Sequence, residues 1–364
     1  MRRSAASRPV AGAAALALGV SLTIGAAAGA AGAGSGYVTD EGEIYQLDTN
    51  TMTLAPTATL AGPLVALTTA TDGELYGIDD ADQSLQQIDP ITGVETGQGP
   101  LLAPADPDRS FAALTTLPGG KLYASSYSVA ISGTSLDGQL YVVNSATGAA
   151  TARGNQQADD ALVSLAGSCD GTLFGVDDAN QLVRVSTATG VATPVGALSP
   201  SLPVNASVAL AFDHAKNTLW ALAYQLGDGP EQLFKVDPSN GTMTATSFQS
   251  GQLGSDPSTL TLDSPAQCRY ARSLSLTHPA GTSRFEGLLR APQRPACAAL
   301  QPIRLMRQQP GADRQVGSVL TNGQGKFRFG APSQRGKYYA VAAKRSGADG
   351  VCLAAQSRAL GFVP

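Results

Sequence analysis

The amino-acid sequence predicts an all-β protein with more than one domain. Of the 364 residues, 41 are Gly and 22 are Pro, which is too rich in turn-forming residues for a helical protein. A short apolar motif recurs at a fixed spacing between residues 37 and 262, and the sign of the net charge reverses after Cys268. The length also exceeds that of one ordinary domain.

Residues 1–31 are predicted to be a secretory signal peptide. Three arginines lie within the first eight residues, residues 10–24 are apolar, and Ala26 and Ala28 form an Ala-x-Ala frame. Cleavage is expected after Ala28 or Ala31, and the alternative is an uncleaved anchor. Beyond the signal no apolar run approaches the roughly 20 residues of a spanning helix. The sequence therefore predicts a secreted, extracellular protein without a membrane span after cleavage.

A repeated hairpin organises residues 37–262. In each copy an apolar residue opens an alternating strand, and a Gly follows eight residues later in a tight turn, where a positive φ costs little. The four full copies run from Leu85 to Gly93, Leu140 to Gly148, Leu182 to Gly190 and Leu233 to Gly241. A fifth copy, from Ile44 to Met52, lacks the Gly.

A second motif, an aromatic residue after a leucine, precedes each full hairpin. The motifs are LYG at Leu75, LYA at Leu122, LFG at Leu173 and LWA at Leu219. Another leucine lies eight or nine residues upstream, at Leu67, Leu114, Leu165 and Leu210. Each repeat therefore contains four short strands. Four strands in a repeat of about 40 to 50 residues are typical of a β-propeller blade.

The two ends of the repeat array complement each other. The first copy begins at Tyr37 with a second strand, and residues 258–262 form an isolated inner strand. The last strand would complete the first blade, which would leave no open sheet edge. The sequence thus predicts a five-bladed β-propeller over residues 32–268, with strand-exchange closure.

One aromatic residue recurs in the second strand of each blade, where a ligand cage or a packed core would both be possible. The regular placement favours packing between adjacent blades. The residues are Tyr37, Tyr76, Tyr123, Phe174 and Trp220.

The repeated motifs resemble those of bacterial secreted β-propellers with an LY-x-ID-x-x-TG pattern. The resemblance covers about 225 residues and implies the propeller fold. It leaves the function open, because propellers include binding modules, lactonases and lyases.

Residues 269–364 form a second, basic domain. They contain 15 basic and three acidic residues, a formal charge of +12, whereas residues 32–268 contain six basic and 25 acidic residues, a formal charge of −19. About seven alternating strands predict a β-sandwich. Residues 321–341, with a Gly-turned hairpin before G-K-Y-Y, resemble carboxypeptidase-regulatory or transthyretin-like domains. This resemblance implies an immunoglobulin- or transthyretin-like β-sandwich that serves, as is usual in that family, as an accessory module without catalysis.

Four cysteines are expected to form two disulfides, because export leads to an oxidising compartment. Cys297 and Cys352 both lie in the basic domain. Cys169 and Cys268 each follow an inner strand at the same end of the propeller. We therefore expect the pairs Cys297–Cys352 and Cys169–Cys268. No CxxC spacing occurs, and with two histidines in the chain a zinc site is not expected.

Catalytic signals are weak. No GxSxG occurs, and His214 is expected to be a solvated turn residue. Two Asp-rich turns follow the aromatic strand of two blades, and their oxygens could hold a divalent cation such as calcium. These candidate metal ligands are Asp79, Asp80, Asp82, Asp177 and Asp178. No other cofactor is predicted.

Three functions are compatible with the sequence. The first is a secreted, non-catalytic propeller that binds a protein, glycan or cell-surface partner, with the basic sandwich as accessory module. The second is a metal-assisted propeller enzyme of lactonase or lyase type. The third is a structural envelope protein. The basic domain suits an anionic cell-surface glycan, nucleic acid is not an expected partner of an exported chain, and a monomer is expected.

Overall fold

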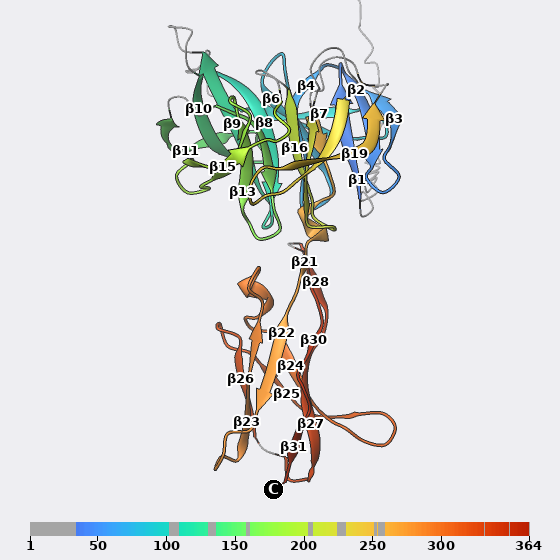
Figure 1. Ribbon diagram of the computed structural model, residues 1–364, viewed down its shortest axis with the longest axis vertical. Helices are drawn as coiled ribbons and strands as arrows, with labels where there is room; N and C mark the ends of the chain where they lie inside the picture. The colour runs from blue at the N-terminus through green and yellow to red at the C-terminus, as the bar shows by residue number, and fades with distance from the viewer. Residues whose placement is uncertain are drawn as a thin grey trace, which may run out of the picture.

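The computed structural model describes residues 34–101, 109–129, 136–157, 161–202, 207–223, 231–250, 253, 259–330, 332–348 and 350–363. The predicted signal peptide, residues 1–31, lies outside this part of the chain. Five four-stranded antiparallel sheets form one end of the elongated molecule, and the C-terminal sheets form the other (Figure 1).

The five sheets, called blade sheets 1 to 5, are consistent with five propeller blades. Blade sheet 1 has the order β20-β1-β2-β3, and the other four follow the chain. Their strands are β1 (Ser35–Asp40), β2 (Glu43–Asp48), β3 (Thr53–Thr59) and β20 (Thr259–Thr261); β4 (Leu64–Thr69), β5 (Leu75–Asp79), β6 (Ser84–Ile88) and β7 (Glu95–Pro100); β8 (Arg109–Leu117), β9 (Lys121–Val129), β10 (Leu136–Val143) and β11 (Ala150–Gln157); β12 (Leu162–Gly167), β13 (Leu173–Asp177), β14 (Gln181–Val185) and β15 (Ala192–Ala197); β16 (Val208–Asp213), β17 (Thr218–Ala223), β18 (Glu231–Val236) and β19 (Met243–Ser250).

Blade sheet 1 combines strands from both ends of the repeat array. β20 pairs antiparallel with β1, with Val38 opposite Leu260, and β1 pairs with β2. The isolated strand near residue 260 and the copy that starts at Tyr37 therefore share one sheet, as the repeat count predicts.

The turn between the third and fourth strands needs a left-handed residue. The repeat glycines have φ between +71° and +81°, and Met52 takes the same place in blade sheet 1 with φ of +57°. Each repeat glycine also lies against a carbonyl oxygen of the preceding sheet's outer strand, so a side chain would collide there. The glycines are Gly93, Gly148, Gly190 and Gly241.

Apolar side chains pack between successive blade sheets. Each recurring aromatic residue is buried in one of these clusters, which confirms that these rings serve as core rather than as a ligand cage. Tyr37 packs between sheets 1 and 2, Tyr76 between 2 and 3, Tyr123 between 3 and 4, Phe174 between 4 and 5, and Trp220 between 5 and 1.

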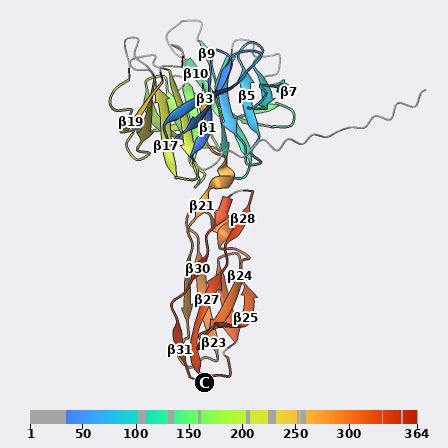
Figure 2. The same ribbon diagram turned by 90° about the vertical axis from the view of Figure 1, so that its right-hand side faces the viewer.

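A short connection leads from β20 to the C-terminal sheets (Figure 2). It contains the 3-10 helix η1 (Pro265–Gln267) and a small sheet of order β21-β29-β28, with β21 (Arg269–Tyr270), β28 (Arg345–Gly347) and β29 (Gly350–Cys352). We call this segment the neck. A disulfide joins Cys169, after β12, to Cys268 in the neck, and a second joins Cys297 to Cys352. These are the pairs expected from the sequence.

Beyond the neck, two sheets share one apolar core and are called the C-terminal sheet pair. One has the order β22-β23-β26 and the other β25-β24-β27-β30, with β31 also on β27. Their strands are β22 (Ser273–Thr277), β23 (Arg284–Arg290), β24 (Pro302–Arg307), β25 (Arg314–Leu320), β26 (Lys326–Gly330), β27 (Gly336–Ala342), β30 (Ala355–Gln356) and β31 (Leu360–Phe362). A short 3-10 helix η2 (Pro295–Cys297) lies between β23 and β24.

Candidate functional site at the axis of the blade sheets

Five leucines fill the space between the inner strands. The leucines are Leu67, Leu114, Leu165, Leu210 and Leu260, one from each of β4, β8, β12, β16 and β20. Each is buried. Two small cavities lie along this axis, and each has a volume of about 20 Å³, enough for about one water molecule. Each of these two cavities is therefore too small for an organic substrate.

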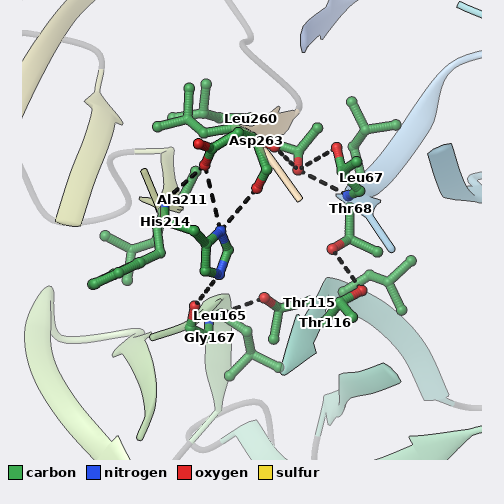
Figure 3. Close-up of a pocket in the computed structure, with 16 residues that line it drawn as sticks. Leu67, Thr68, Thr115, Thr116, Leu165, Gly167, Ala211, His214, Leu260 and Asp263 are labelled. Carbon is green, nitrogen blue, oxygen red and sulfur yellow. Dashed lines mark hydrogen bonds and ion pairs between the residues drawn. The ribbon is translucent and has the colours of Figure 1, made fainter. Parts of the chain in front are cut away.

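Threonine hydroxyls link the inner strands at one end of the axis (Figure 3). The Oγ1 atoms of Thr68 and Thr116 are 3.2 Å apart, and Thr261 Oγ1 accepts a 3.0 Å hydrogen bond from the Thr69 amide. Thr115 Oγ1 accepts another of 3.0 Å from the Gly167 amide. These bonds satisfy buried polar groups and fix the spacing of neighbouring sheets.

His214 is buried at the same end, contrary to the expectation of a solvated turn residue. Its Nδ1 atom lies 2.8 Å from the carbonyl oxygen of Asp263, and its Nε2 atom lies 2.9 Å from that of Gly167 (Figure 3). A carbonyl oxygen only accepts hydrogen bonds, so a ring nitrogen that carries a proton donates it to the carbonyl that it faces. Both ring nitrogens thus face backbone rather than the cavity.

Asp263 supports this histidine from the strand end of blade sheet 1. Its two carboxylate oxygens accept hydrogen bonds of 2.7 Å from the His214 amide and 3.0 Å from the Ala215 amide, and Oδ1 lies 3.5 Å from His214 Nδ1. The carboxylate is buried. The hydrogen bonds from the His214 and Ala215 amides to Asp263 therefore join blade sheets 5 and 1 at this end of the axis.

Asp213 is a second fully buried carboxylate beside this group. Burial is the largest cause that raises the pKa of this carboxyl above its ordinary value, and the negative charge of Asp263 raises the pKa further. Its Oδ1 accepts a 2.8 Å bond from the Lys216 amide, while Lys216 Nζ lies 3.7 Å from Oδ2 and donates to Thr49 Oγ1 at 2.8 Å. This arrangement connects blade sheet 5 to the turn after β2.

The Asp-rich turns are separate from the axis. Asp79, at the end of β5, accepts hydrogen bonds from the amides of Ala81 and Asp82 through Oδ1, at 2.8 and 3.0 Å. Asp82 caps Ser84 in the same way at 2.9 Å. These are the bonds of turn-forming Asp residues.

The second Asp-rich turn has the same local structure. Asp177, at the end of β13, accepts from the amides of Ala179 and Gln181 at 3.0 and 2.7 Å, and Asp178 is exposed beside it, as Asp80 is in the first turn. The two turns belong to blade sheets 2 and 4 and do not meet. Within the described residues no group of three His, Cys, Asp or Glu side chains is placed to hold a metal ion.

A polar hollow of about 260 Å³ opens between blade sheets 4 and 5 and the chain after β23. Asp170, Arg184 and Gln293 line it, and the Arg184 guanidinium lies 5.9 Å from the Phe174 ring centre. Partial burial acts to raise the pKa of Asp170, but hydrogen bonds from Ser168 and Thr172 lower it below its ordinary value.

A larger cleft of about 460 Å³ opens beside β26 in the C-terminal sheet pair. The sequence predicted neither of the two hollows, because their walls come from segments far apart in the chain.

The buried histidine had a detectable signal in the sequence. Asp213 lies three residues after Leu210, and Asp263 lies three residues after Leu260, so two equivalent strand ends carry carboxylates. His214 follows the first of them directly.

Comparisons with known proteins show no family. No family model matches the chain, and no curated protein matches it in sequence. Three of the similar solved structures have TM-scores of 0.34 to 0.39. A Bacteroides caccae protein of unknown function is 13% identical, with 63% of this chain and 98% of that chain covered, at a TM-score of 0.38.

The other two carry functional titles. A putative gluconolactonase is 14% identical, with 72% and 91% covered, at a TM-score of 0.39. An oligogalacturonate lyase in complex with manganese is 14% identical, with 68% and 66% covered, at a TM-score of 0.34. Among the residues that the structure describes, no helix has the length and apolar character needed to cross a membrane.

Proposed function

We propose that the protein is a secreted, non-catalytic binding protein. In this proposal the blade sheets form a closed five-bladed β-propeller, and the C-terminal sheet pair is a basic β-sandwich that holds an anionic cell-surface partner. The propeller is then presented away from that surface and is available for a further protein or glycan partner.

The end-on arrangement of the two parts is the observation that carries the proposal. The C-terminal sheet pair extends from the neck, so the blade sheets do not cover its outer faces (Figures 1 and 2). Residues 269–364 have a formal charge of +12. Most of their basic side chains are exposed. A concentrated, uncovered positive charge attracts polyanions over a distance of about 10 Å at 0.1 M salt.

Export is supported by the N-terminal signal pattern and the two disulfides, which persist in an oxidising compartment.

The axis supports binding rather than catalysis. Leucines fill it, and both ring nitrogens of His214 are engaged by backbone carbonyls. A metal-assisted lactonase or lyase would need an open axial site with converging ligands. Asp79 and Asp177 instead cap turns of two separate sheets.

Binding of the full chain to dextran sulfate beads tests the proposal, with plain dextran beads as the neutral control. We expect retention on the sulfated beads at about 0.05 M salt and release at about 0.5 M salt, since salt screens exposed charges. Equal retention on both beads, or retention on neither, would overturn it. A panel of lactones with added divalent cations tests the non-catalytic part, which measurable turnover would refute.

A further inference from the structure

We propose that the outer face of the sheet β22-β23-β26 binds a linear acidic polysaccharide. This inference rests on the proposed function and specifies which face of the basic part meets the partner.

The strands of this sheet alternate between the core and the surface, strictly in β22 and β26, and with three half-buried residues in the middle of β23. Leu274, Phe285 and Phe327 are buried between the two sheets. The alternate positions of the same strands are turned outward. These outward positions carry four cations, Arg284, Arg290, Lys326 and Arg328, and one carboxylate, Glu286. The face therefore has an excess of three positive charges.

The single carboxylate of this face is already neutralised. Glu286 Oε1 lies 2.8 Å from Arg284 Nε and 3.2 Å from Arg328 Nε. Each guanidinium has five N–H donors, so both arginines keep donors for an external anion. Lys326 lies opposite Leu288, the outward position of β23 that follows Glu286. Arg290 is the next outward position of β23 and lies opposite Ser273 of β22. These two cations therefore continue the charged group along the sheet.

A cleft opens beside β26, next to two of the cations. Its volume is about 460 Å³, which lies in the range of ligand sites, roughly 300 to 1,000 Å³. Lys326, Arg328 and the paired carboxylate Glu286 line it, together with Leu320 and Asn322. A sugar ring can therefore enter beside the cations, with its carboxylate held at the rim.

Hydroxyl groups continue the face on the neighbouring strand. β22 presents Ser273, Ser275 and Thr277 outward. Ser275 and Thr277 donate to backbone carbonyls at 3.3 and 3.2 Å, which leaves their oxygen lone pairs as acceptors for sugar hydroxyls.

The chemistry of the face favours an acidic polysaccharide over nucleic acid. Its described outward positions on these three strands carry cations, hydroxyls, one carboxylate and Leu288, and no aromatic ring. Proteins that bind single-stranded nucleic acid stack the bases on aromatic rings, and none is offered here.

The opposite face of the pair differs. On β24 and β27 the outward positions alternate cations with apolar side chains, so that Arg304 pairs across the strands with Val341, and Met306 with Tyr339. Arg304 and Lys337 there are exposed, which makes them a matched control of equal charge.

The experiment uses the full chain, alginate as a linear polyuronate, and pullulan as a neutral glucan. We compare Arg290→Gln/Lys326→Gln with the control Arg304→Gln/Lys337→Gln by calorimetric titration. All four side chains are exposed, and thermal melts verify that each variant is folded. We expect the first variant to bind alginate roughly 5- to 30-fold more weakly than the native protein. The control should stay within about twofold.

Each outcome is decisive. Equal losses of alginate affinity in both variants, or a larger loss in the control, would overturn the assignment of binding to this face and leave the proposed function intact. Tighter binding to poly(dT) or to anionic lipid vesicles than to alginate would overturn the assignment of an acidic polysaccharide as the ligand. No binding to any of these polyanions overturns the proposed function as well.

Discussion

Gly190, with φ of +75°, lies against the carbonyl oxygen of Arg153 in the neighbouring sheet, so that a Cβ atom at position 190 would stand 2.6 Å from that oxygen. The same contact recurs at each repeat glycine. The glycine thus serves both the hairpin turn and the approach of two blade sheets.

Gly190→Ala should lower the free energy of unfolding by more than the left-handed conformation alone requires. That conformation costs a non-glycine residue about 1 to 2 kcal/mol, and the close contact adds displacement of the neighbouring sheet. Gly171→Ala is the matched control, because Gly171 has φ of +86° and nothing within 4 Å of its Cβ position. Urea denaturation, monitored by tryptophan fluorescence, measures the free energy of unfolding of both variants. Equal losses would show that the contact between sheets is irrelevant.

Replacing Cys169 and Cys268 together by Ala should destabilise the protein by about 4 to 5 kcal/mol in the chain-entropy description. The two cysteines are 99 residues apart in the sequence, whereas Cys297 and Cys352 are 55 apart. The second double variant should therefore lose slightly less, about 4 kcal/mol. Urea denaturation of each variant provides the measurement. An unchanged midpoint in the Cys169/Cys268 variant would contradict the expectation.

Asp213→Asn should stabilise the protein at neutral pH. Burial, followed by the charge of Asp263, raises the pKa of Asp213 above its ordinary value of 3.8, so the folded state favours the neutral carboxyl. The contribution of Asp213 to stability is thus fully present below pH 3.8 and is lost as the pH rises through the raised pKa. Asn keeps the oxygen that accepts from the Lys216 amide.

The advantage of Asp213→Asn should therefore vanish in acid. Urea denaturation at neutral pH and at about pH 3.5 measures the two differences. A variant less stable than the native protein at neutral pH would show that the Lys216 ion pair outweighs the burial.

Trp220 offers a test of packing between blade sheets 5 and 1. It is the single tryptophan of the chain, is 1% exposed, and its indole Nε1 has no hydrogen-bond partner among the described residues. Trp220→Ala should cost about 3 to 5 kcal/mol through loss of buried volume. Trp220→Phe should cost less than about 2 kcal/mol, because it keeps a ring and removes an unpaired buried N–H.

Circular dichroism during urea denaturation measures both variants, since neither retains a tryptophan. Similar losses in the two would mean that the indole, rather than the filled volume, stabilises this interface.

The blade sheets could be predicted because their information is local and repeated. The eight-residue interval from Leu182 to Gly190 encodes one strand and its turn, and it recurs in register through the chain. Met52 shows the limit of such patterns, because it adopts a left-handed φ of +57° at the turn position where the other repeats have a glycine.

The candidate sites could not be predicted to the same extent, because they depend on contacts between distant segments. His214 lies in a turn of ordinary polar composition, and its burial follows from Asp263, 49 residues later. The cleft beside β26 likewise combines Glu286 with Leu320 and Lys326. Neither contact has a counterpart in the repeat pattern.

The Cys169–Cys268 bond determines how mechanical tension passes between the two ends of the molecule. A pull on the C-terminal sheets reaches Cys268, where it divides between the backbone leading to β20 in blade sheet 1 and the disulfide leading to the turn after β12 in blade sheet 4. Within the described residues β20 pairs with β1 at three positions, and Asp263 just after it accepts hydrogen bonds from the His214 and Ala215 amides of blade sheet 5. With the disulfide intact, a protein tethered to a surface in flowing liquid shares its load between two covalent routes, whereas reduction leaves the whole load on the backbone that leads to β20 and on the hydrogen bonds around Asp263.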